Sequence, residues 1–316
     1  MKKVIGPLLT VLVAFVLAVL GFVLGGFSLS ALQVETLTIL MIVCGISMAY
    51  CFIVGEISRN NSQMDKLWSI LPIAYAWIVA VKSGMNLRVV VMAVLITIWG
   101  VRLTLNFAKK GAYSLKFWAG EEDYRWIILR KHPMLSKRWR WALFDLFFIS
   151  IYQNALVLAI CLPLLAVMES TAAFNVLDIL VAALLLGFII LETIADPQQM
   201  HFQTKKFDLL KQGLKLEELP SPYHKGFNTQ GLWGRSRHPN YFAEQAIWVV
   251  LCLFCISAGV TKYVFFNWTL IGSMVLILLF MGSSAFSEGV SLKKYPSYKD
   301  YIQKVSKYVP LKKYSE

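Results

Sequence analysis

The chain has 316 residues, of which 58% are hydrophobic and 16% are charged. Soluble globular proteins carry about 25% charged residues, so this composition excludes an ordinary soluble domain. The formal net charge of +13 is concentrated in alternate loops, whereas a nucleic-acid-binding domain would carry it on one basic face. We therefore expect an integral membrane protein that binds no nucleic acid.

Apolar runs long enough to cross about 30 Å of hydrocarbon predict an all-α, polytopic membrane helical bundle with about eight transmembrane helices. The predicted spans are, in chain order, 4–27, 36–55, 67–81, 87–107, 143–168, 176–195, 241–258 and 264–282. The first run is about twice as long as the apolar part of a signal peptide, and no A-x-A site follows it, so we predict a retained span. The fifth span contains Pro163, which a packed transmembrane helix tolerates as a kink.

Loop charges predict the orientation of the bundle. Lysine and arginine collect at the N-terminus, after the second, fourth and sixth predicted spans, and in the tail, whereas the intervening loops carry almost none. This alternation follows the positive-inside rule with both termini in the cytoplasm. The long segments 108–142 and 197–240 are then cytoplasmic, and we expect them to cap that face because long ordered loops tend to be functional.

All five cysteines fall inside apolar runs. Cys252 and Cys255 form a C-x-x-C pair, but the neighbouring residues are Val, Leu and Phe. This setting favours buried thiols that act as small hydrophobes over a redox or metal-binding pair. We expect no disulfide framework.

A pair of carboxylates lies at the cytoplasmic end of the sixth predicted span, in "ETIADPQQMHF". Glu192 and Asp196 are four residues apart and so share one helix face. Carboxylates that close repel each other unless a cation or a hydrogen-bond donor lies between them, or one is protonated. Asp196 can be a solvated helix end, but Glu192 lies one turn deeper and is interpreted as functional.

A second polar group stands at the start of the seventh predicted span, in "GLWGRSRHPNYFAEQAIW". Asn240 and Glu244 are again four residues apart, with Tyr241 beside them. A helix N-terminus offers unbonded N–H groups and a positive dipole, which suit an anionic ligand, and Arg235 and Arg237 add cationic forks for phosphate. Alternatively, these two arginines contact lipid headgroups, but that interpretation leaves the Asn–Glu pair unexplained.

Two further polar features allow alternatives. Arg102 lies in the fourth predicted span, about two turns from its cytoplasmic end, where it can snorkel to water or pair with Glu192 or Glu244. The tail "YPSYKDYIQKVSKYVPLKK" is expected to lie on an anionic membrane surface, although Tyr301 can equally close over a bound nucleotide.

Together these groups suit a ligand with an anionic phosphate part and an uncharged head that forms hydrogen bonds. A nicotinamide dinucleotide has this shape, and S-adenosylmethionine has it less well. The sequence has no G-x-G-x-x-G motif and no P-loop, so a Rossmann site is not expected. No metal site is predicted.

The motif "RHPNYFAE" resembles the R-H-P-N-Y-x-G-E signature of the steroid 5-alpha-reductase-like membrane protein family, in its DUF1295 branch. That family is related to sterol reductases and isoprenylcysteine carboxyl methyltransferases. Other matching segments follow in order: "MDKLWSILP", "IWGVRLTLNFAKKG", "EEDYRWIILRKH", "LETIADPQQMHF" and "YKDYIQKVSKYVP". We therefore divide the chain into N-terminal transmembrane helices at 1–64 and a family domain at 65–316. The resemblance implies a membrane reductase that uses NADPH from the cytoplasmic side to reduce a carbon–carbon double bond of a lipid or steroid-like substrate.

The resemblance also implies roles for individual residues. Asn240 and Glu244 match the N-x-x-x-E that contacts the nicotinamide end in the reductases. Asp196 matches an aspartate of the preceding helix motif, and Arg102 matches the arginine of H-Y-x-x-R, whereas Glu192 stands where the steroid enzymes carry asparagine. From the resemblance and the charge pattern together, the predicted NADPH-binding set is Asn240, Glu244, Glu192, Asp196, Arg102, Arg235, Arg237, His238 and Tyr301.

The acid pair of the steroid enzymes is missing. Trp99 stands where they carry the tyrosine that protonates the substrate, and Ile70 stands where they carry a catalytic glutamate. Either another group donates the proton, with Tyr241 and Asp65 as the candidates, or the substrate is not a 3-oxo steroid.

Two other functions stay open. The isoprenylcysteine carboxyl methyltransferases share R-H-P-x-Y, but there the residue after His-Pro is usually small and no carboxylate follows one turn later. The missing acid pair also allows a non-enzymatic lipid-binding membrane protein. We expect a monomer or small oligomer in a bacterial inner membrane or an endoplasmic reticulum, with the site facing the cytoplasm.

Overall fold

The structure, a computed structural model, describes residues 27–261, 267–311 and 314, and the separate positions 16, 20, 23 and 24. Within this part of the chain every regular element is a helix, which confirms the predicted all-α class. The chain divides into two compact units. Residues 1–182 and 250–275 form the first unit, and residues 183–249 and 276–316 form the second.

Six of the described helices are long and apolar enough to cross a membrane. They are Ala31–Ser58, Leu87–Lys109, Arg138–Val167, Val176–Lys211, Pro239–Ser257 and Leu270–Lys294. They correspond to the second and to the fourth through eighth predicted spans, so the integral membrane bundle is confirmed. The third predicted span is a helix of only 13 residues, α4 (Ile70–Lys82), short of the roughly 20 that a span needs. The first predicted span lies almost wholly outside the described residues, so the count of about eight and the orientation stay predictions.

In the first unit, α2 (Ala31–Ser58) begins with a capping box, in which the Ser30 side chain accepts a hydrogen bond from the backbone N–H of Gln33. The side chains on its buried face are mostly small and weakly polar: Thr36, Leu40, Cys44, Ser47, Cys51 and Gly55. Its exposed face carries Ile42, Ile46 and Ile53. This order is typical of a membrane helix, because the outward face meets lipid and small inward residues let helices approach closely.

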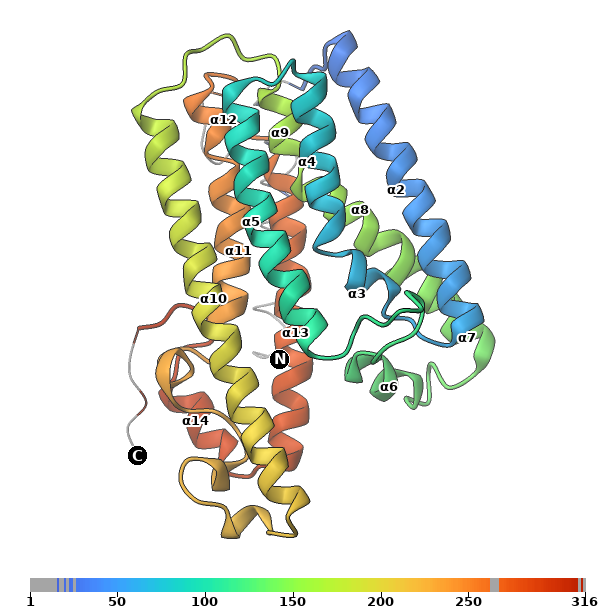
Figure 1. Cartoon of the computed structure of the whole chain (residues 1–316), viewed down its shortest axis with the longest axis vertical. Helices are drawn as coiled ribbons and strands as arrows, with labels where there is room; N and C mark the ends of the chain where they lie inside the picture. Colours follow the sequence, from blue (N-terminus) through green and yellow to red (C-terminus); the bar gives the residue numbers. More distant parts are fainter. Residues whose placement is uncertain are drawn as a thin grey trace. The chain divides into compact units, whose positions relative to one another are not determined.

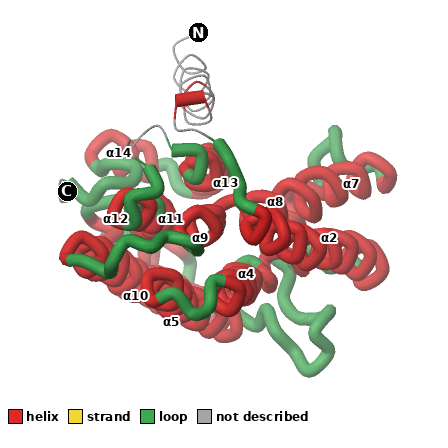
Figure 2. Tube along the Cα trace, turned by 90° about the horizontal axis from the view of Figure 1, so that it is seen from above, coloured by secondary structure: helices red, strands yellow, loops and turns green. Residues whose placement is uncertain are grey.

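Helices α4 and α5 (Leu87–Lys109) pack side by side in the first unit (Figures 1 and 2). Gly100 of α5 makes their close approach possible. A Cβ atom there would lie 2.5 Å from the carbonyl oxygen of Ser69, just before α4. Trp99, the neighbour of this glycine, is fully buried. Short helices α3 (Gln63–Leu67) and α6 (Tyr124–Arg130) flank the loops of this unit.

The fifth predicted span consists of several consecutive segments. They are α7 (Arg138–Phe144), the π-helix η1 (Asp145–Tyr152), α8 (Gln153–Ile160) and α9 (Leu162–Val167). The break between α8 and α9 at Cys161 follows from Pro163, which occupies the first turn of α9, where a residue without an N–H is tolerated. Both η1 and α8 pack against α2.

A buried ion pair in the first unit joins Arg88, near the start of α5, to Asp178, near the start of the helix Val176–Lys211. Arg88 donates from Nε to Asp178 Oδ1 (2.7 Å) and from Nη2 to Oδ2 (2.9 Å), and the Ser257 hydroxyl, in α12 (Phe254–Ser257), also donates to this carboxylate. The two charged side chains are almost completely buried. Their position inside apolar surroundings is tolerated because the pair is bidentate and hydrogen-bonded on both sides.

The second unit contains residues 183–211 of α10 (Val176–Lys211), most of α11 (Pro239–Leu251), the later part of α13 (Leu270–Lys294) and α14 (Tyr298–Lys304). The 3-10 turns η2 (Leu216–Glu218), η3 (Tyr223–Lys225) and η4 (Gly231–Gly234) connect α10 to α11. The tail packs here into an aromatic core of Phe227, Tyr298, Tyr301 and Val305. It is therefore part of the folded unit as well as a basic segment.

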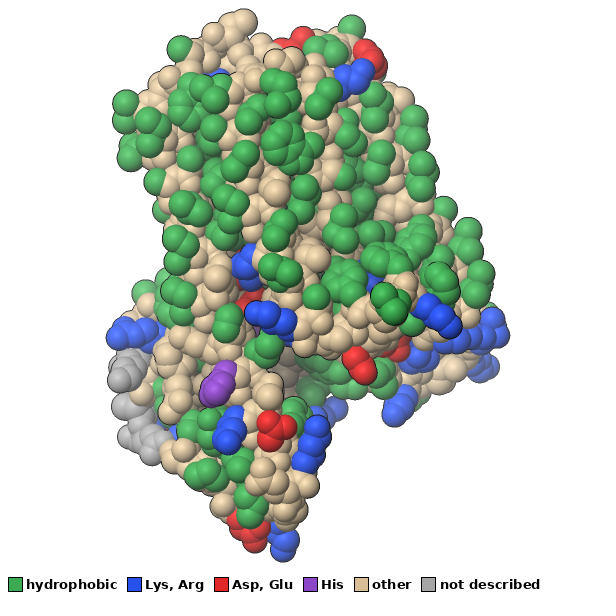
Figure 3. All heavy atoms as spheres, in the orientation of Figure 1, with side chains coloured by type: hydrophobic (Ala, Val, Ile, Leu, Met, Phe, Trp, Pro, Cys, Tyr) green, Lys and Arg blue, Asp and Glu red, His purple; other side chains and the backbone are tan. Residues whose placement is uncertain are grey.

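The five cysteines, Cys44, Cys51, Cys161, Cys252 and Cys255, are all buried thiols, as their apolar surroundings predict. In the first unit, hydrophobic side chains cover the visible surface over α2, α4 and α5 (Figure 3). Lysine and arginine side chains gather instead at the end of this unit where α7 lies (Figures 1 and 3). This separation matches a body in lipid with a charged end in water.

Candidate functional site

The loop before α11 is held by the tail of the second unit. The backbone N–H groups of Arg237 and His238 donate to the carbonyl oxygens of Ser306 and Lys307, each at 3.0 Å. An isolated parallel bridge pairs Ser236 with Ser306. Because the loop is fixed on this side, the first turn of α11, which carries Asn240, has a defined position.

Asn240 joins α11 to α10. Its Nδ2 donates to Oδ1 of Asp196 at 3.1 Å. The rings of Phe188 in α10 and Phe242 in α11 also meet edge to face, with 5.7 Å between their centroids. The turn before α11 is bonded to α10 as well, because Trp233 Nε1 donates to the Ala195 carbonyl oxygen at 2.9 Å. Within the described part of the chain no donor reaches Oδ1 of Asn240, although that atom is buried. A buried acceptor without a donor is costly, so this oxygen is available to a ligand.

Two more predicted carboxylates are buried on the same helices. Glu192 of α10 and Glu244 of α11 are each only 4% exposed. Oε1 of Glu244 accepts a hydrogen bond from Nε1 of the buried Trp248, one turn further along (3.1 Å). Burying carboxylates is expensive. The structure therefore places four predicted residues, Glu192, Asp196, Asn240 and Glu244, on two helices that the Asp196–Asn240 hydrogen bond connects.

Glu288 of α13 organises the basic residues before α11. Arg237 donates from Nε to Glu288 Oε1 at 2.8 Å, and its Nη1 donates to the carbonyl oxygens of Ile302 (2.9 Å) and Val305. Nε2 of His238 lies 3.0 Å from the same Oε1. Burial lowers the pKa of His238 below its ordinary 6.5, so the neutral ring donates from Nε2 to the carboxylate.

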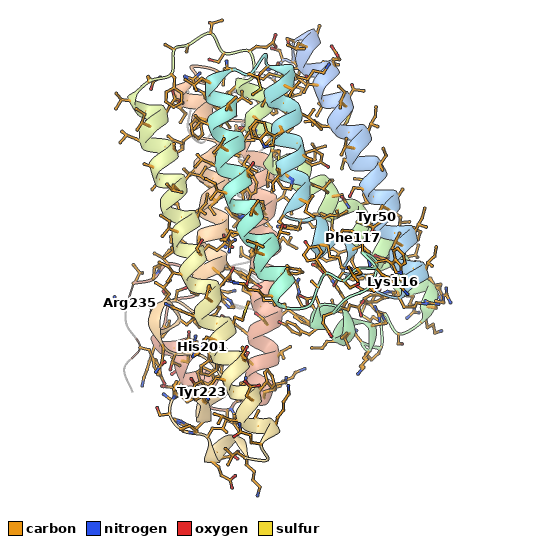
Figure 4. The ribbon with its side chains drawn as sticks, viewed as in Figure 1. Tyr50, Lys116, Phe117, His201, Tyr223 and Arg235 are labelled. Atoms are coloured by element: carbon orange, nitrogen blue, oxygen red, sulfur yellow. The ribbon has the colours of Figure 1, made fainter. Side chains whose placement is uncertain are left out.

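The two predicted phosphate-binding arginines therefore have different surroundings. The Arg237 guanidinium is buried and bonded within the unit. Arg235 has an exposed side chain at the edge of the unit (Figure 4). Glu288 is absent from the residues predicted from the sequence, although a signal exists: it is the one carboxylate in the sequence of α13, a helix that begins as an apolar span.

Tyr241 and Tyr301 have different environments. The Tyr241 ring stacks on His238 (5.2 Å between centroids, 15° between planes) and meets Phe280 edge-on at 4.5 Å. It is half-buried beside Asn240. The Tyr301 hydroxyl donates to the carbonyl oxygens of Trp233 and Ser236, and burial raises the pKa of Tyr301. Tyr301 thus stays a neutral donor that fastens the loop before α11.

The remaining predicted residues, Asp65 and Arg102, belong to the first unit. Asp65 accepts hydrogen bonds from Trp126 Nε1 (2.7 Å) and Arg125 Nη2 (3.4 Å). Burial raises the pKa of Asp65, and the nearby Arg125 only partly opposes this shift. Arg102 is half-buried on α5. Its pairing with a glutamate stays a prediction.

The arrangement in the second unit provides buried hydrogen-bond acceptors, a phenol and an exposed cation. Among the residues that the structure covers, no group of three or more His, Cys, Asp or Glu side chains is arranged to hold a metal ion. Such a set of groups suits recognition of a ligand that has amide or hydroxyl donors and an anionic part.

Comparison with known proteins places the chain in a family. A family model described as a protein of unknown function (DUF1295) matches residues 51–305. The chain belongs to the DUF1295 family. An uncharacterized protein of Schizosaccharomyces pombe, C594.04c, is 33% identical over 286 residues, which cover 82% of this chain and 77% of that relative. No solved structure matches. All the predicted site residues lie inside the range that the DUF1295 model matches.

Proposed function

We propose that this DUF1295 membrane protein is an NADPH-dependent reductase of a carbon–carbon double bond in a lipid or steroid-like substrate. The observation that carries the proposal is the buried Oδ1 of Asn240, to which the described residues supply no donor, beside the carboxylate of Asp196. A nicotinamide carboxamide has two N–H donors and one carbonyl acceptor, so the open oxygen can accept one of its N–H groups.

The other groups of the second unit fit the rest of a dinucleotide. Buried carboxylates such as Glu192 and Glu244 accept hydrogen bonds from amide and hydroxyl donors. Arg235, with its exposed guanidinium, is the arginine left for phosphate, since Arg237 is bonded to Glu288. When bound, NADPH would supply a hydride to one carbon of the double bond.

A neutral acid must then protonate the other carbon. Tyr241 is our first choice because its ring is fixed between His238 and Phe280 and lies next to Asn240 in the sequence. Asp65, the other candidate from the sequence, belongs to the first unit, and its raised pKa favours the protonated form that an acid requires. Tyr241→Phe and Asp65→Asn separate the two, because only the variant that lacks the acid should lose turnover while still binding NADPH.

The test of cofactor binding is thermal unfolding of the full-length protein in detergent with saturating NADPH or S-adenosylmethionine. Ligand at about 100 times its Kd stabilises the folded state by about 2.7 kcal/mol. We expect NADPH to raise the Tm of the wild type and of Gln245→Leu, a control on α11 whose side chain donates to the local carbonyl of Tyr241. Asn240→Leu should lose this rise.

Three results contradict the proposal. An unchanged NADPH shift in Asn240→Leu would remove the role of its carboxamide. Stabilisation by S-adenosylmethionine instead of NADPH would indicate a methyltransferase. Stabilisation by neither, with lipid that copurifies and is not turned over, would indicate a non-enzymatic lipid-binding protein.

A further inference from the structure

In the first unit, the helices α6 and α7 have one face fixed to the protein. Nε1 of Trp126 donates to Asp65 Oδ2 at 2.7 Å, and Nε1 of Trp141 donates to Asn61 Oδ1 at 3.0 Å. Both tryptophans are buried. Because these bonds fix the inward faces, most of the remaining side chains of the two helices and of the segment between them are exposed or partly exposed.

This surface is strongly apolar for a loop region. Trp139 is 59% exposed and Met134 is 69% exposed. Ile127, Ile128 and Leu143 are also exposed large hydrophobic residues. Contiguous apolar side chains on a surface indicate a contact with a membrane or a partner.

The same surface carries more cations than carboxylates. Between Asp123 and Asp145 the sequence has no aspartate or glutamate. Arg125 and Arg130 bind Asp123 and Glu122. For four others no ion pair occurs among the described residues: Lys131, Lys137, Arg138 and Arg140. Lysine and arginine side chains form a visible group at the α7 end of the first unit (Figure 3).

The position of the segment in the chain indicates which anion it meets. Arg138 is the first residue of the membrane-spanning stretch Arg138–Val167, so the cations lie at the boundary between hydrocarbon and headgroups. Tryptophan is enriched at that boundary. The segment is also ordered, because His132 and Leu135 donate backbone hydrogen bonds to Leu129 and His132, at 3.0 and 2.8 Å.

We propose that segment 131–140 binds the phosphate of an anionic glycerophospholipid. Lys131, Lys137, Arg138 and Arg140 supply the cations, and Trp139 and Met134 contact the acyl chains next to the headgroup. Each lysine or arginine near an anionic membrane surface strengthens lipid attraction, and no carboxylate of the segment opposes it. This lipid site is independent of the proposed reductase site in the second unit.

The experiment uses the full-length protein in a neutral detergent, titrated with phosphatidylglycerol, phosphatidylcholine or inorganic phosphate, with Tm as the measurement. The test variant is K131Q/K137Q/R138Q/R140Q. The matched control, K205Q/K211Q/K215Q/K293Q, removes four exposed lysines of the second unit. We expect phosphatidylglycerol to stabilise the wild type and the control at similar concentrations. The test variant, which lacks four cations, should require on the order of several hundredfold more phosphatidylglycerol, or respond no more than to phosphatidylcholine.

The lipid site is excluded if the test variant responds to phosphatidylglycerol as the wild type does, or if phosphatidylcholine stabilises the wild type equally. An equal effect of inorganic phosphate would overturn the lipid as the ligand, because free phosphate makes no acyl contacts. If the fourfold variant unfolds without lipid, the same titration is made with the double variants K131Q/K137Q and R138Q/R140Q. Each double variant should weaken the response to phosphatidylglycerol.

Discussion

Glu288 and Arg237 form an ion pair in the second unit, with 2.8 Å between Arg237 Nε and Glu288 Oε1, and both side chains are largely buried. The pair fastens the loop before α11 to α13. Because Arg237 also donates to two carbonyl oxygens of the tail, one guanidinium joins three segments that are far apart in the sequence. The position of Asn240 depends on this junction.

Glu288→Ala should destabilise the protein by about 3–5 kcal/mol, because it leaves the Arg237 charge buried without its carboxylate. The control is Lys304→Ala, which breaks an exposed pair with Asp300 in the same unit and should cost less than about 1 kcal/mol. Thermal unfolding in detergent measures both. Equal losses in the two variants would mean that the buried pair does not hold the loop.

The stability of the protein should fall as the pH falls through about 6.5. Burial lowers the pKa of His238 in the folded state below its ordinary 6.5, so the unfolded chain binds the proton first. The stability from the neutral ring is present above the unfolded pKa and is lost as the pH falls through the folded pKa. Tm measured from pH 8 to pH 5 should show a smaller decrease for His238→Asn than for the wild type; identical pH profiles would exclude His238 as the cause.

Gly272→Ala should destabilise the first unit strongly. A Cβ atom at Gly272 would lie 2.3 Å from the carbonyl carbon and oxygen of Ala159, and backbone atoms cannot move aside as side chains can. We expect a loss of at least about 1–3 kcal/mol, as for other overpacked sites. Gly282→Ala on the same helix is the control, because no atom of the described residues, apart from its chain neighbours and the local helix backbone, lies within 4 Å of its Cβ position. The control should leave Tm unchanged or raise it slightly, and a loss there as large as at Gly272 would contradict the packing interpretation.

The Arg88–Asp178 pair should show strong coupling in a double-mutant cycle. Asp178→Ala leaves a buried guanidinium without its carboxylate, so we expect a loss of about 3–5 kcal/mol. The double variant Arg88→Met/Asp178→Leu should lose less than Asp178→Ala alone, because no charge remains to be desolvated. Additive losses, measured by thermal unfolding, would show that the two side chains act independently.

The spans could be predicted from the sequence because hydropathy depends on each segment alone. The apolar runs at 36–55 and 87–107 correspond to α2 and α5, and Pro163 marks the break before α9. The prediction at 67–81 was less accurate, because Ser69 precedes α4 and the residues before it form the separate helix α3. Helix α13 continues to Lys294, well beyond the predicted end at 282, because the polar residues of its last turns find partners within the unit.

The contacts of the site could be predicted only in part. The sequence predicted Asp196 near the end of the sixth span, where it could be a solvated helix end, and Asn240 at the start of the seventh. In the structure α10 continues past Asp196 to Lys211, and the Asp196 carboxylate accepts a hydrogen bond from Asn240. The partnership of Arg237 with Glu288 spans 51 residues, and no local pattern encodes a pairing over that separation. For the same reason the sequence could not distinguish Arg237, which is buried, from Arg235, which is exposed.

The burial of all five cysteines gives the native chain little reactivity toward maleimides and other alkylating probes, since such reagents need an accessible thiolate. Native thiols should therefore be labelled only when helices open locally, so that the labelling rate measures the rate of local unfolding. A single cysteine introduced at an exposed position such as Lys131 would carry a fluorophore without prior removal of the natural ones.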